Sequence, residues 1–447
     1  MPKTKYSGVK WLGNIPEEWK VVRVDYYKDL NSNYPIGDGD HGTVTPEDYI
    51  NEGIPYIRVQ NLSWGNHIIT DNIVYISEAV NRKNKKSILK PGDIVIAKTG
   101  ATIGKIGIIP DKMLEANTTS SVGKVSVDNK YSNKYVFYSL LSDSSYQQMW
   151  DKANMKSAQP GFNIEDLIKF KICFPPIKEQ HLIADFLDEK VDIIDKIIDD
   201  LNNQIEILNK YKKQIITETV TSGLNKNVKF KDSGIDWMGE IPEHWEIKRL
   251  KYLGSARNGL TYEPEDQCDE GMLVLRSSNI QDGKLCLDDN VYVNMKVPKN
   301  IILKRNDLLI CSRNGSRNLI GKNILIEDSI EGNTYGAFMC VFRSEYNKYI
   351  HYVLNSNIFE HYLNTFLTST INQLTNSNLY SIKIAIPMDI EEQQEIVKYL
   401  DDRCQKIDEI LNSKIKQKKQ MEQYKKSVIY EYVTGKKRVE GAEELYE

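Results

Sequence analysis

Two glycine-rich, basic segments with similar residue types recur in the sequence. They read AKTGATIGK at 97–105 and SRNGSRNLIGK at 312–322, and each lies between two short apolar runs that predict strands. Glycine allows close backbone approach, lysine binds phosphates, and arginine or asparagine can read base edges. Each segment is therefore a candidate DNA-contacting loop, and the alternative is a solvated turn of a domain that binds something else. The candidate residues are Lys98, Thr99, Thr102 and Lys105 in the first loop, and Arg313, Asn314, Ser316, Arg317 and Lys322 in the second.

A second repeated pattern adds hydrogen-bonding side chains. The strand-like run PYIRVQNL at 55–62 matches LVLRSSNI at 273–280, so that arginine and asparagine recur at the same places. Both side chains pair well with bases, and we expect both runs to contribute DNA contacts. The candidates are Arg58, Gln60 and Asn61, with Arg276, Ser278 and Asn279, and the basic stretch before the first loop adds Lys83.

The charge distribution favours the same two regions. The formal net charge of -3 argues against a basic surface over the whole protein. Between positions 81 and 112, however, eight basic residues accompany two acidic ones, and between 296 and 325 seven accompany one. Each stretch contains one of the predicted loops, which is the local charge excess expected of a DNA-binding surface.

Catalytic motifs are weak in this sequence. The loops superficially resemble a phosphate-binding GxxxxGK[ST], but the glycine spacing differs and neither lysine is followed by Ser or Thr. Asp188, Glu189 and Lys190 fit a nuclease-like fragment, yet they lie on a predicted helix, where solvated charge is common. The six histidines form no HExxH and the six cysteines no CxxC, so we expect buried free thiols. No catalytic residue and no metal ligand is predicted.

Two long helices must position the loops. In the segment from Ile177, the apolar residues alternate steps of four and three, which is the heptad spacing of a coiled coil. These residues are Leu187, Val191, Ile194, Ile198, Leu201, Ile205 and Leu208. The segment IKEQHLIADFLDEKVDIIDKI at 177–197 returns as IEEQQEIVKYLDDRCQKIDEI at 390–410, an offset of 213. The chain is therefore an internal duplication with two rods.

Each rod follows a globular half with the same opening. SGVKWLGNIPEEW at 7–19 returns as SGIDWMGEIPEHW at 233–245. The short linker and the shared seam predict an α+β chain of two similar α/β domains, whose rods form an antiparallel coiled coil with pseudo-twofold symmetry. The expected boundaries are 1–176 for the first domain, 177–222 for its rod, 223–232 for a linker, 233–389 for the second domain, 390–435 for its rod and 436–447 for a tail.

The composition predicts a soluble globular protein. With 40% hydrophobic and 27% charged residues, the chain is ordinary for such proteins. It has no apolar signal region at its start and no apolar run long enough to span a membrane. A cytoplasmic location is expected.

The repeated SGxxWxGxIPxxW opening, the IxEQ start of each rod and the domain-rod-domain-rod order resemble the specificity subunits of type I restriction-modification systems. The resemblance implies a noncatalytic chain in which each globular part is a target recognition domain for one half of a bipartite site in double-stranded DNA. It also implies that two modification subunits dock on the rods, carry S-adenosylmethionine and methylate adenine, and that restriction subunits use ATP with Mg²⁺. No cofactor is implied for this chain. We expect an outer polar docking surface at Glu179, Gln180, Glu392 and Gln393.

Two other functions stay open on the sequence alone. One is a self-sufficient DNA-modifying enzyme, and the other is a coiled-coil scaffold that joins two proteins. Methyl transfer by the isolated chain would favour the enzyme. Salt-sensitive, sequence-selective binding to duplex DNA would exclude the scaffold.

Overall fold

The computed structural model describes residues 3–65, 67–155, 160–281, 283–367 and 372–442. It divides into two compact units, Met1–Leu201 with Gln417–Glu447 and Asn202–Lys416. Both units contain a globular part and portions of two long helices, α5 (Ile177–Ser222) and α9 (Ile390–Val433). Helix α9 ends before the expected position 435 because Gly435, with φ of +68°, takes the left-handed conformation that closes helices.

The first unit has two main sheets and two further two-stranded ones, β1-β2 and β11-β3. The larger sheet has the order β4-β10-β7-β8 and the smaller one β6-β5-β9. Its strands and short helices are β1 (Thr4–Tyr6), β2 (Asn14–Pro16), β3 (Lys20–Arg23), β4 (Ile36–Asp38), β5 (Ile54–Ile57), β6 (Val74–Ile76), α1 (Glu78–Lys83), β7 (Ile94–Ala97), β8 (Ile106–Ile108), β9 (Asn117–Thr118), β10 (Val122–Val125), α2 (Asn133–Leu141), α3 (Asp143–Ala153), α4 (Ile164–Leu167) and β11 (Lys171–Phe174).

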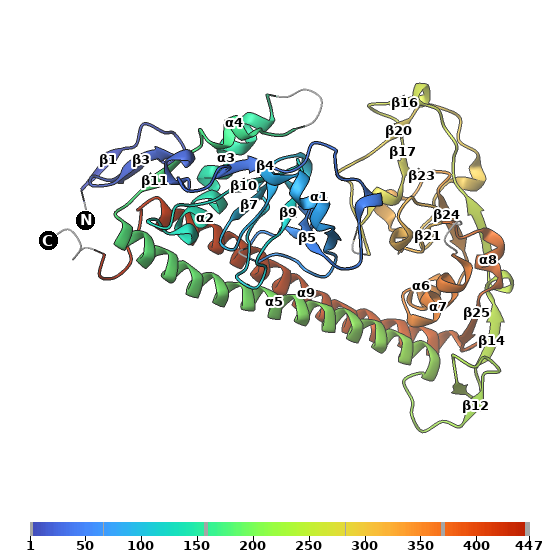
Figure 1. Cartoon of the computed structure of the whole chain (residues 1–447). Helices are drawn as coiled ribbons and strands as arrows, with labels where there is room; N and C mark the ends of the chain where they lie inside the picture. The colour runs from blue at the N-terminus through green and yellow to red at the C-terminus, as the bar shows by residue number, and fades with distance from the viewer. Residues whose placement is uncertain (1–2, 66, 156–159, 282, 368–371, 443–447) are drawn as a thin grey trace. The chain divides into compact units, whose positions relative to one another are not determined.

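The apolar run of β7 explains this layering. All four of its residues are buried, as expected for a strand covered on both faces. Ile94 and Ile96 join the core cluster that contains α2, whereas Val95 and Ala97 join the cluster under the smaller sheet. The central sheet therefore lies between helices on one face and the smaller sheet on the other (Figure 1).

The second unit repeats this plan. Its two main sheets have four strands each, in the orders β15-β24-β21-β22 and β16-β20-β17-β23. The strands and short helices are β12 (Phe230–Asp232), β13 (Glu240–Pro242), β14 (Glu246–Arg249), β15 (Ser255–Asn258), β16 (Gln267–Cys268), β17 (Met272–Leu275), β18 (Ile280–Gln281), β19 (Lys284–Leu285), β20 (Tyr292–Val293), β21 (Leu308–Cys311), β22 (Asn323–Leu325), β23 (Thr334–Tyr335), β24 (Met339–Arg343), α6 (Asn347–Val353), α7 (Asn357–Phe366), α8 (Asn376–Ser381) and β25 (Lys383–Ile386).

The repeated tryptophans of the opening segments anchor the globular parts to the helices. Trp19 is fully buried and its Nε1 donates to Oε2 of Glu179 at 2.9 Å. Trp245 is equally buried and donates to Oε1 of Glu392 at 2.9 Å. Each tryptophan thus binds the first turn of the helix that follows its own domain.

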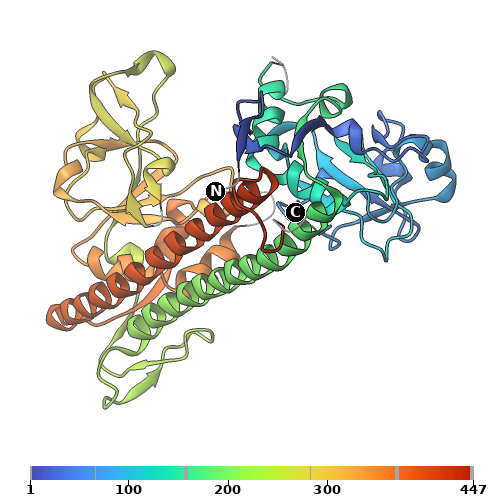
Figure 2. The ribbon, with the colours of Figure 1, turned by 90° about the vertical axis from the view of Figure 1, so that its left-hand side faces the viewer.

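Helices α5 and α9 run side by side in opposite directions (Figure 2). In the first unit, Lys425 of α9 donates to Asp195 of α5 at 2.7 Å. In the second unit, Lys212 of α5 donates to Asp408 of α9 at 2.6 Å. The expected seam is buried at Leu187, Val191, Ile194 and Leu201, and half-buried at Ile198, Ile205 and Leu208. The predicted antiparallel pair is confirmed.

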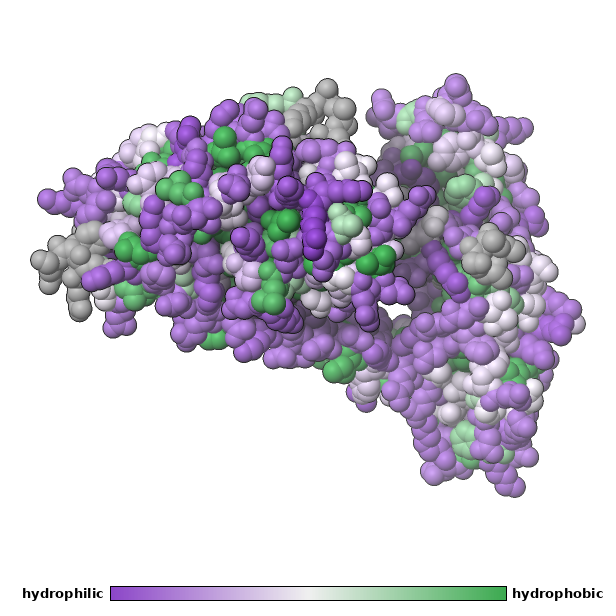
Figure 3. Space-filling view, viewed as in Figure 1, coloured by the Kyte–Doolittle hydropathy of each residue, from purple (hydrophilic) through white to green (hydrophobic). Residues whose placement is uncertain are grey.

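The surface is predominantly polar. On the face shown in Figure 3, apolar residues lie scattered among hydrophilic ones. None of the described helices is both long and apolar enough to cross a membrane. All six cysteines are free, but only four of them are buried, because Cys268 and Cys286 lie in the partly exposed hairpin region of the second unit.

Candidate nucleic-acid interface

The loop after β21 is fixed through its main chain. The carbonyl oxygen of Phe338 accepts hydrogen bonds from the amides of Ser312 and Arg313, both at 3.0 Å, and from the Ser312 hydroxyl at 2.9 Å. On the other side, Leu374 N donates to Ser312 O at 2.8 Å, and Arg313 forms an antiparallel bridge with Gln373. The backbone at Arg313 is therefore held from two neighbouring segments.

The side chains of this loop are presented differently from one another. Arg313 is exposed, and its guanidinium carbon lies 5.2 Å from the centroid of the Phe338 ring. Asn314 shapes the loop, because it donates to Ser277 Oγ at 3.0 Å and accepts from Ser316 N at 2.9 Å. Ser316 and Arg317 are exposed at the start of a short 3-10 turn. Their contact with DNA stays a prediction.

We call the main-chain hydrogen bonds that hold this loop its frame. The loop after β7 in the first unit has a similar frame but other side chains. Lys98 N donates to Ser121 O at 2.9 Å, and Phe162 N donates to Lys98 O at 3.1 Å. Thr99 therefore occupies the place of Arg313, and Ser121 that of Phe338. The Thr102 hydroxyl donates to Thr99 O at 2.9 Å, which closes the loop.

Lys98 does not face solvent. It is only 4% exposed, and its ammonium group forms an ion pair with Asp38. A buried ammonium needs such a partner, since desolvating an unpaired charge is costly. The expectation that Lys98 lies at the DNA is therefore wrong.

The repeated asparagines hold turns. Asn61 and Asn279 are buried, and each accepts a hydrogen bond at 2.9 Å from the amide three residues before it, that of Arg58 or Arg276. Their amide groups also donate to main-chain carbonyls at 3.0 and 2.9 Å. The expectation of DNA contacts by these two residues is wrong, because all of this bonding is directed into the domain.

Arg58 and Arg276 also bind their own domains. The Arg58 guanidinium donates to Asn72 O at 2.9 Å and lies 5.6 Å from the Tyr49 ring centroid. The Arg276 guanidinium pairs with the Asp289 carboxylate at 2.8 Å. Both side chains are half-buried and bind their own domains through one terminal nitrogen, whereas Nε of each guanidinium has no hydrogen-bond partner among the described residues, so base contact by either arginine stays a prediction.

The other candidates differ in accessibility. Gln60 and Lys83 are exposed, whereas Lys105, Ser278 and Lys322 are half-buried. Nζ of Lys322 lies 3.4 Å from the carbonyl oxygen of Ile280. These five remain candidate contacts.

The expected docking residues do not form an outer surface. Glu179, Gln180 and Gln393 are buried, and Glu392 is partly covered. Gln180 donates to Pro175 O at 3.0 Å, and Gln393 donates to Pro387 O at 2.7 Å. The expectation of an outward polar face is wrong, since the glutamates bind the tryptophans and the glutamines bind the turns that precede the helices.

Sequence reasoning missed Phe338 and Gln373. Phe338 is 58% exposed although it directly precedes a buried strand. The segment TYGAFMCVF carries a weak signal, because a phenylalanine close to a glycine and just outside an apolar run suggests a turn with an exposed ring. Gln373 had no local signal, since only the folded chain brings it opposite Arg313.

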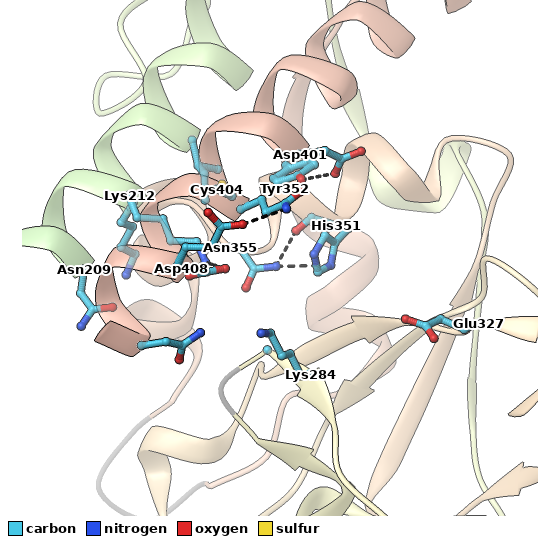
Figure 4. A pocket seen from close by; sticks show the side chains of 16 residues that line it. Asn209, Lys212, Lys284, Glu327, His351, Tyr352, Asn355, Asp401, Cys404 and Asp408 are labelled. Carbon is cyan, nitrogen blue, oxygen red and sulfur yellow. Dashed lines mark hydrogen bonds and ion pairs between the residues drawn. The ribbon is translucent and has the colours of Figure 1, made fainter. Parts of the chain in front are cut away.

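A polar pocket of about 980 Å³ in the second unit does not include this loop. It is lined by α5, α6 and α9 together with Lys284 and Glu327 (Figure 4). Nδ1 of His351 lies 2.9 Å from Oδ1 of Asn323, and burial lowers the pKa of His351 to about 4. Among the described residues, no three His, Cys, Asp or Glu side chains are grouped so that they could hold a metal ion.

Comparison with known proteins agrees with this architecture. A family model described as the type I restriction modification DNA specificity domain matches residues 36–207 and 242–421. The type I restriction enzyme MjaVIII specificity subunit of Methanocaldococcus jannaschii is 30% identical over 447 residues, covering 95% of this chain and 94% of its own length. The putative MjaX specificity subunit of the same organism is 27% identical and covers 96% of each chain.

A solved structure shares the fold. A chain from a structure on complex assembly and conformational transition of the type I R-M system has a TM-score of 0.66 at 14% identity, over 94% of this chain and 98% of its own. The chain belongs to the family of type I restriction-modification DNA specificity subunits. Its function is DNA sequence recognition, and it is not itself an enzyme.

Proposed function

We propose that each unit reads one half of a bipartite DNA target. The observation that carries this proposal is the repeated loop frame, in which Thr99 and Arg313 occupy equivalent places after β7 and β21. Two similar loops with different side chains, half-buried Thr99 and exposed Arg313, suit two different short sequences that flank an unspecified spacer. Exposed Lys83 would bind phosphates and set affinity.

We also propose that two modification subunits dock on the paired helices. Ile197 and Tyr424 are exposed, and they lie within two residues in sequence of Asp195 and Lys425, whose ion pair joins α5 to α9 in the first unit. The offset of 213 relates them to Ile410 and Tyr211 of the second unit, which are exposed as well. Exposed apolar residues that recur at the same repeat positions suit two copies of one partner.

The partners would supply the chemistry. Modification subunits would carry S-adenosylmethionine and methylate adenine, and restriction subunits would use ATP with Mg²⁺. This chain would bind double-stranded DNA in the cytoplasm and contribute no cofactor-binding residue.

Mapping methylated adenines tests the reading proposal. The full chain is produced with its modification subunits in cells that lack other adenine methylation, and the genome is sequenced for modified bases. We expect one motif with two specified halves that disappears when this chain is omitted. A motif with a single specified half, or one that persists without the chain, would contradict the proposal.

Mass measurement of the reconstituted complex tests the docking surface. Changing Ile197 and Tyr424 to Asp should reduce two bound modification subunits to one, and changing all four residues should remove both. The control is Ile207→Asp, because Ile207 is exposed but its equivalent is Gln420. Two bound subunits in the fourfold variant would place docking elsewhere.

A further inference from the structure

Arg313 and Phe338 form a cation-aromatic pair that the equivalent loop positions of the first unit do not repeat. The guanidinium lies over the ring at 5.2 Å, and the ring itself is 58% exposed. In the first unit the equivalent residues are Thr99 and Ser121, which have neither a cation nor an aromatic face. Whatever the pair does is therefore specific to the second unit.

The main chain fixes the two residues relative to one another. The Phe338 carbonyl accepts hydrogen bonds from Ser312 and Arg313, and the bridge to Gln373 holds Arg313 from the other side. The Phe338 ring is not needed by the core, because β24 begins at Met339 with its own buried side chains. The Phe338 ring is therefore available to contact the Arg313 guanidinium.

Stacking on an aromatic face restricts a side chain that otherwise has many rotamers. A guanidinium ordered in this way keeps its edge available for hydrogen bonds while its plane is held by the ring. The ligand that this edge fits in the major groove is guanine, whose O6 and N7 accept two parallel hydrogen bonds. Among the described residues, Arg317 has no such ring beneath it, so the two arginines of the loop are not equivalent.

We propose that Arg313 reads a guanine in the half-site of the second unit and that Phe338 is its positioning residue. This inference rests on the proposed function of the second unit and names one base of its target. Phe338 acts through Arg313 by holding the guanidinium plane, while Arg317 remains a candidate for the phosphates. No guanine in the first half-site is read by an equivalent pair.

The test uses the full chain with its modification subunits. Methylated adenines are mapped in cells for the wild type, Arg313→Ala, Phe338→Leu, Phe338→Tyr and the double variant Arg313→Ala with Phe338→Leu. Duplexes with single base-pair changes in the second half-site then compete for the reconstituted complex. The control is Tyr252→Leu, because Tyr252 is an exposed ring of the same unit with Lys251 over it at 4.6 Å.

Arg313→Ala should lower the preference for one G·C pair of the second half-site by about 5- to 150-fold. Phe338→Leu should lower the preference at the same pair by about 2- to 5-fold. Phe338→Tyr should retain it, since the ring face remains, and Tyr252→Leu should leave it unchanged. The double variant should have the same preference for this base pair as Arg313→Ala alone, because both changes remove the same interaction.

Other outcomes overturn the inference. It is wrong if Phe338→Leu leaves the preference intact, if the two single variants relax different base pairs, or if neither relaxes any. A first half-site that stays specified in every variant shows that the chain still folds and binds. Loss of a two-part motif in the wild type would instead contradict the proposed function.

Discussion

In the first unit, Thr99 follows a lysine that is buried against Asp38, whereas in the second unit Arg313 follows a serine that binds the main chain. The main-chain amides of Lys98 and Ser312 donate to Ser121 O and Phe338 O, and their carbonyls accept from Phe162 N and Leu374 N, but only in the second unit does the next amide, Arg313 N, also donate to Phe338 O. The comparison shows that main-chain atoms build the shared part of the two loops, whereas the side chains differ. A local excess of basic residues does not distinguish these roles, because Lys98 belongs to the domain core and Arg313 to the surface.

The tryptophan anchors provide the strongest test of equivalence between the units. Trp19→Ala and Trp245→Ala should each lower the free energy of unfolding by about 3–5 kcal/mol, because each removes a fully buried ring. Urea denaturation of the full chain measures this loss. Trp64→Ala is the control, since Trp64 is 46% exposed, and it should cost much less. A small effect of either anchor substitution would show that the two units are not held in the same way.

Lys98 tests the distinction between a structural lysine and a DNA-binding one. Lys98→Met should destabilise the chain by about 3 kcal/mol, because it removes the buried ammonium partner of Asp38 and leaves only the exposed His41, at 3.4 Å. It should not change the salt dependence of DNA binding. Lys83→Met is the matched comparison, and it should reduce the slope of log K against log salt by about one with little loss of stability. If Lys98→Met reduces the slope of log K against log salt, Lys98 contacts DNA after all.

His351 gives the second unit an acid-sensitive group that the equivalent position of the first unit lacks. Phe137 occupies the equivalent place, and in both units the next tyrosine donates to a carboxylate of the following long helix, Tyr138 to Asp188 and Tyr352 to Asp401. The pKa of His351 is lowered to about 4 by burial, so protonation favours the unfolded chain. Stability should therefore fall as the pH drops from about 6.5, the ordinary histidine value, towards 4.

Between pH 7 and pH 5, the free energy of unfolding should fall by about 1–2 kcal/mol less in His351→Phe than in the wild type. Urea denaturation at several pH values measures this difference. Only the change with pH is informative, because the variant also loses the contact with Asn323. Equal pH dependence in the variant and the wild type would show that another group causes the acid sensitivity.

The repeats made the architecture predictable from the sequence. Heptad spacing at Leu187, Val191 and Ile194 gave the seam, and helix α5 begins at Ile177, where the repeated IxEQ segment begins. Such periodic patterns depend only on nearby residues, so they can be recognised without the tertiary structure. The duplicated opening segments are also visible in the sequence alone, and they predicted the order of domains and helices.

The site was predictable only as loops, because side-chain direction depends on distant partners. Asp38 is 60 residues from Lys98 in sequence, and no local pattern announced their ion pair. Asn61 and Asn279 were misread, because a repeated asparagine suits base reading and turn capping equally well. Their spacing of three residues after Arg58 and Arg276 is the signal that favours capping.

The frame around Arg313 has an evolutionary consequence. Its hydrogen bonds come almost entirely from main-chain atoms, which remain when the side chains at positions 99, 121, 313 or 338 are replaced. Under the proposed function, exchange of one or two codons would therefore alter which DNA is recognised while the folded backbone of the loop is kept.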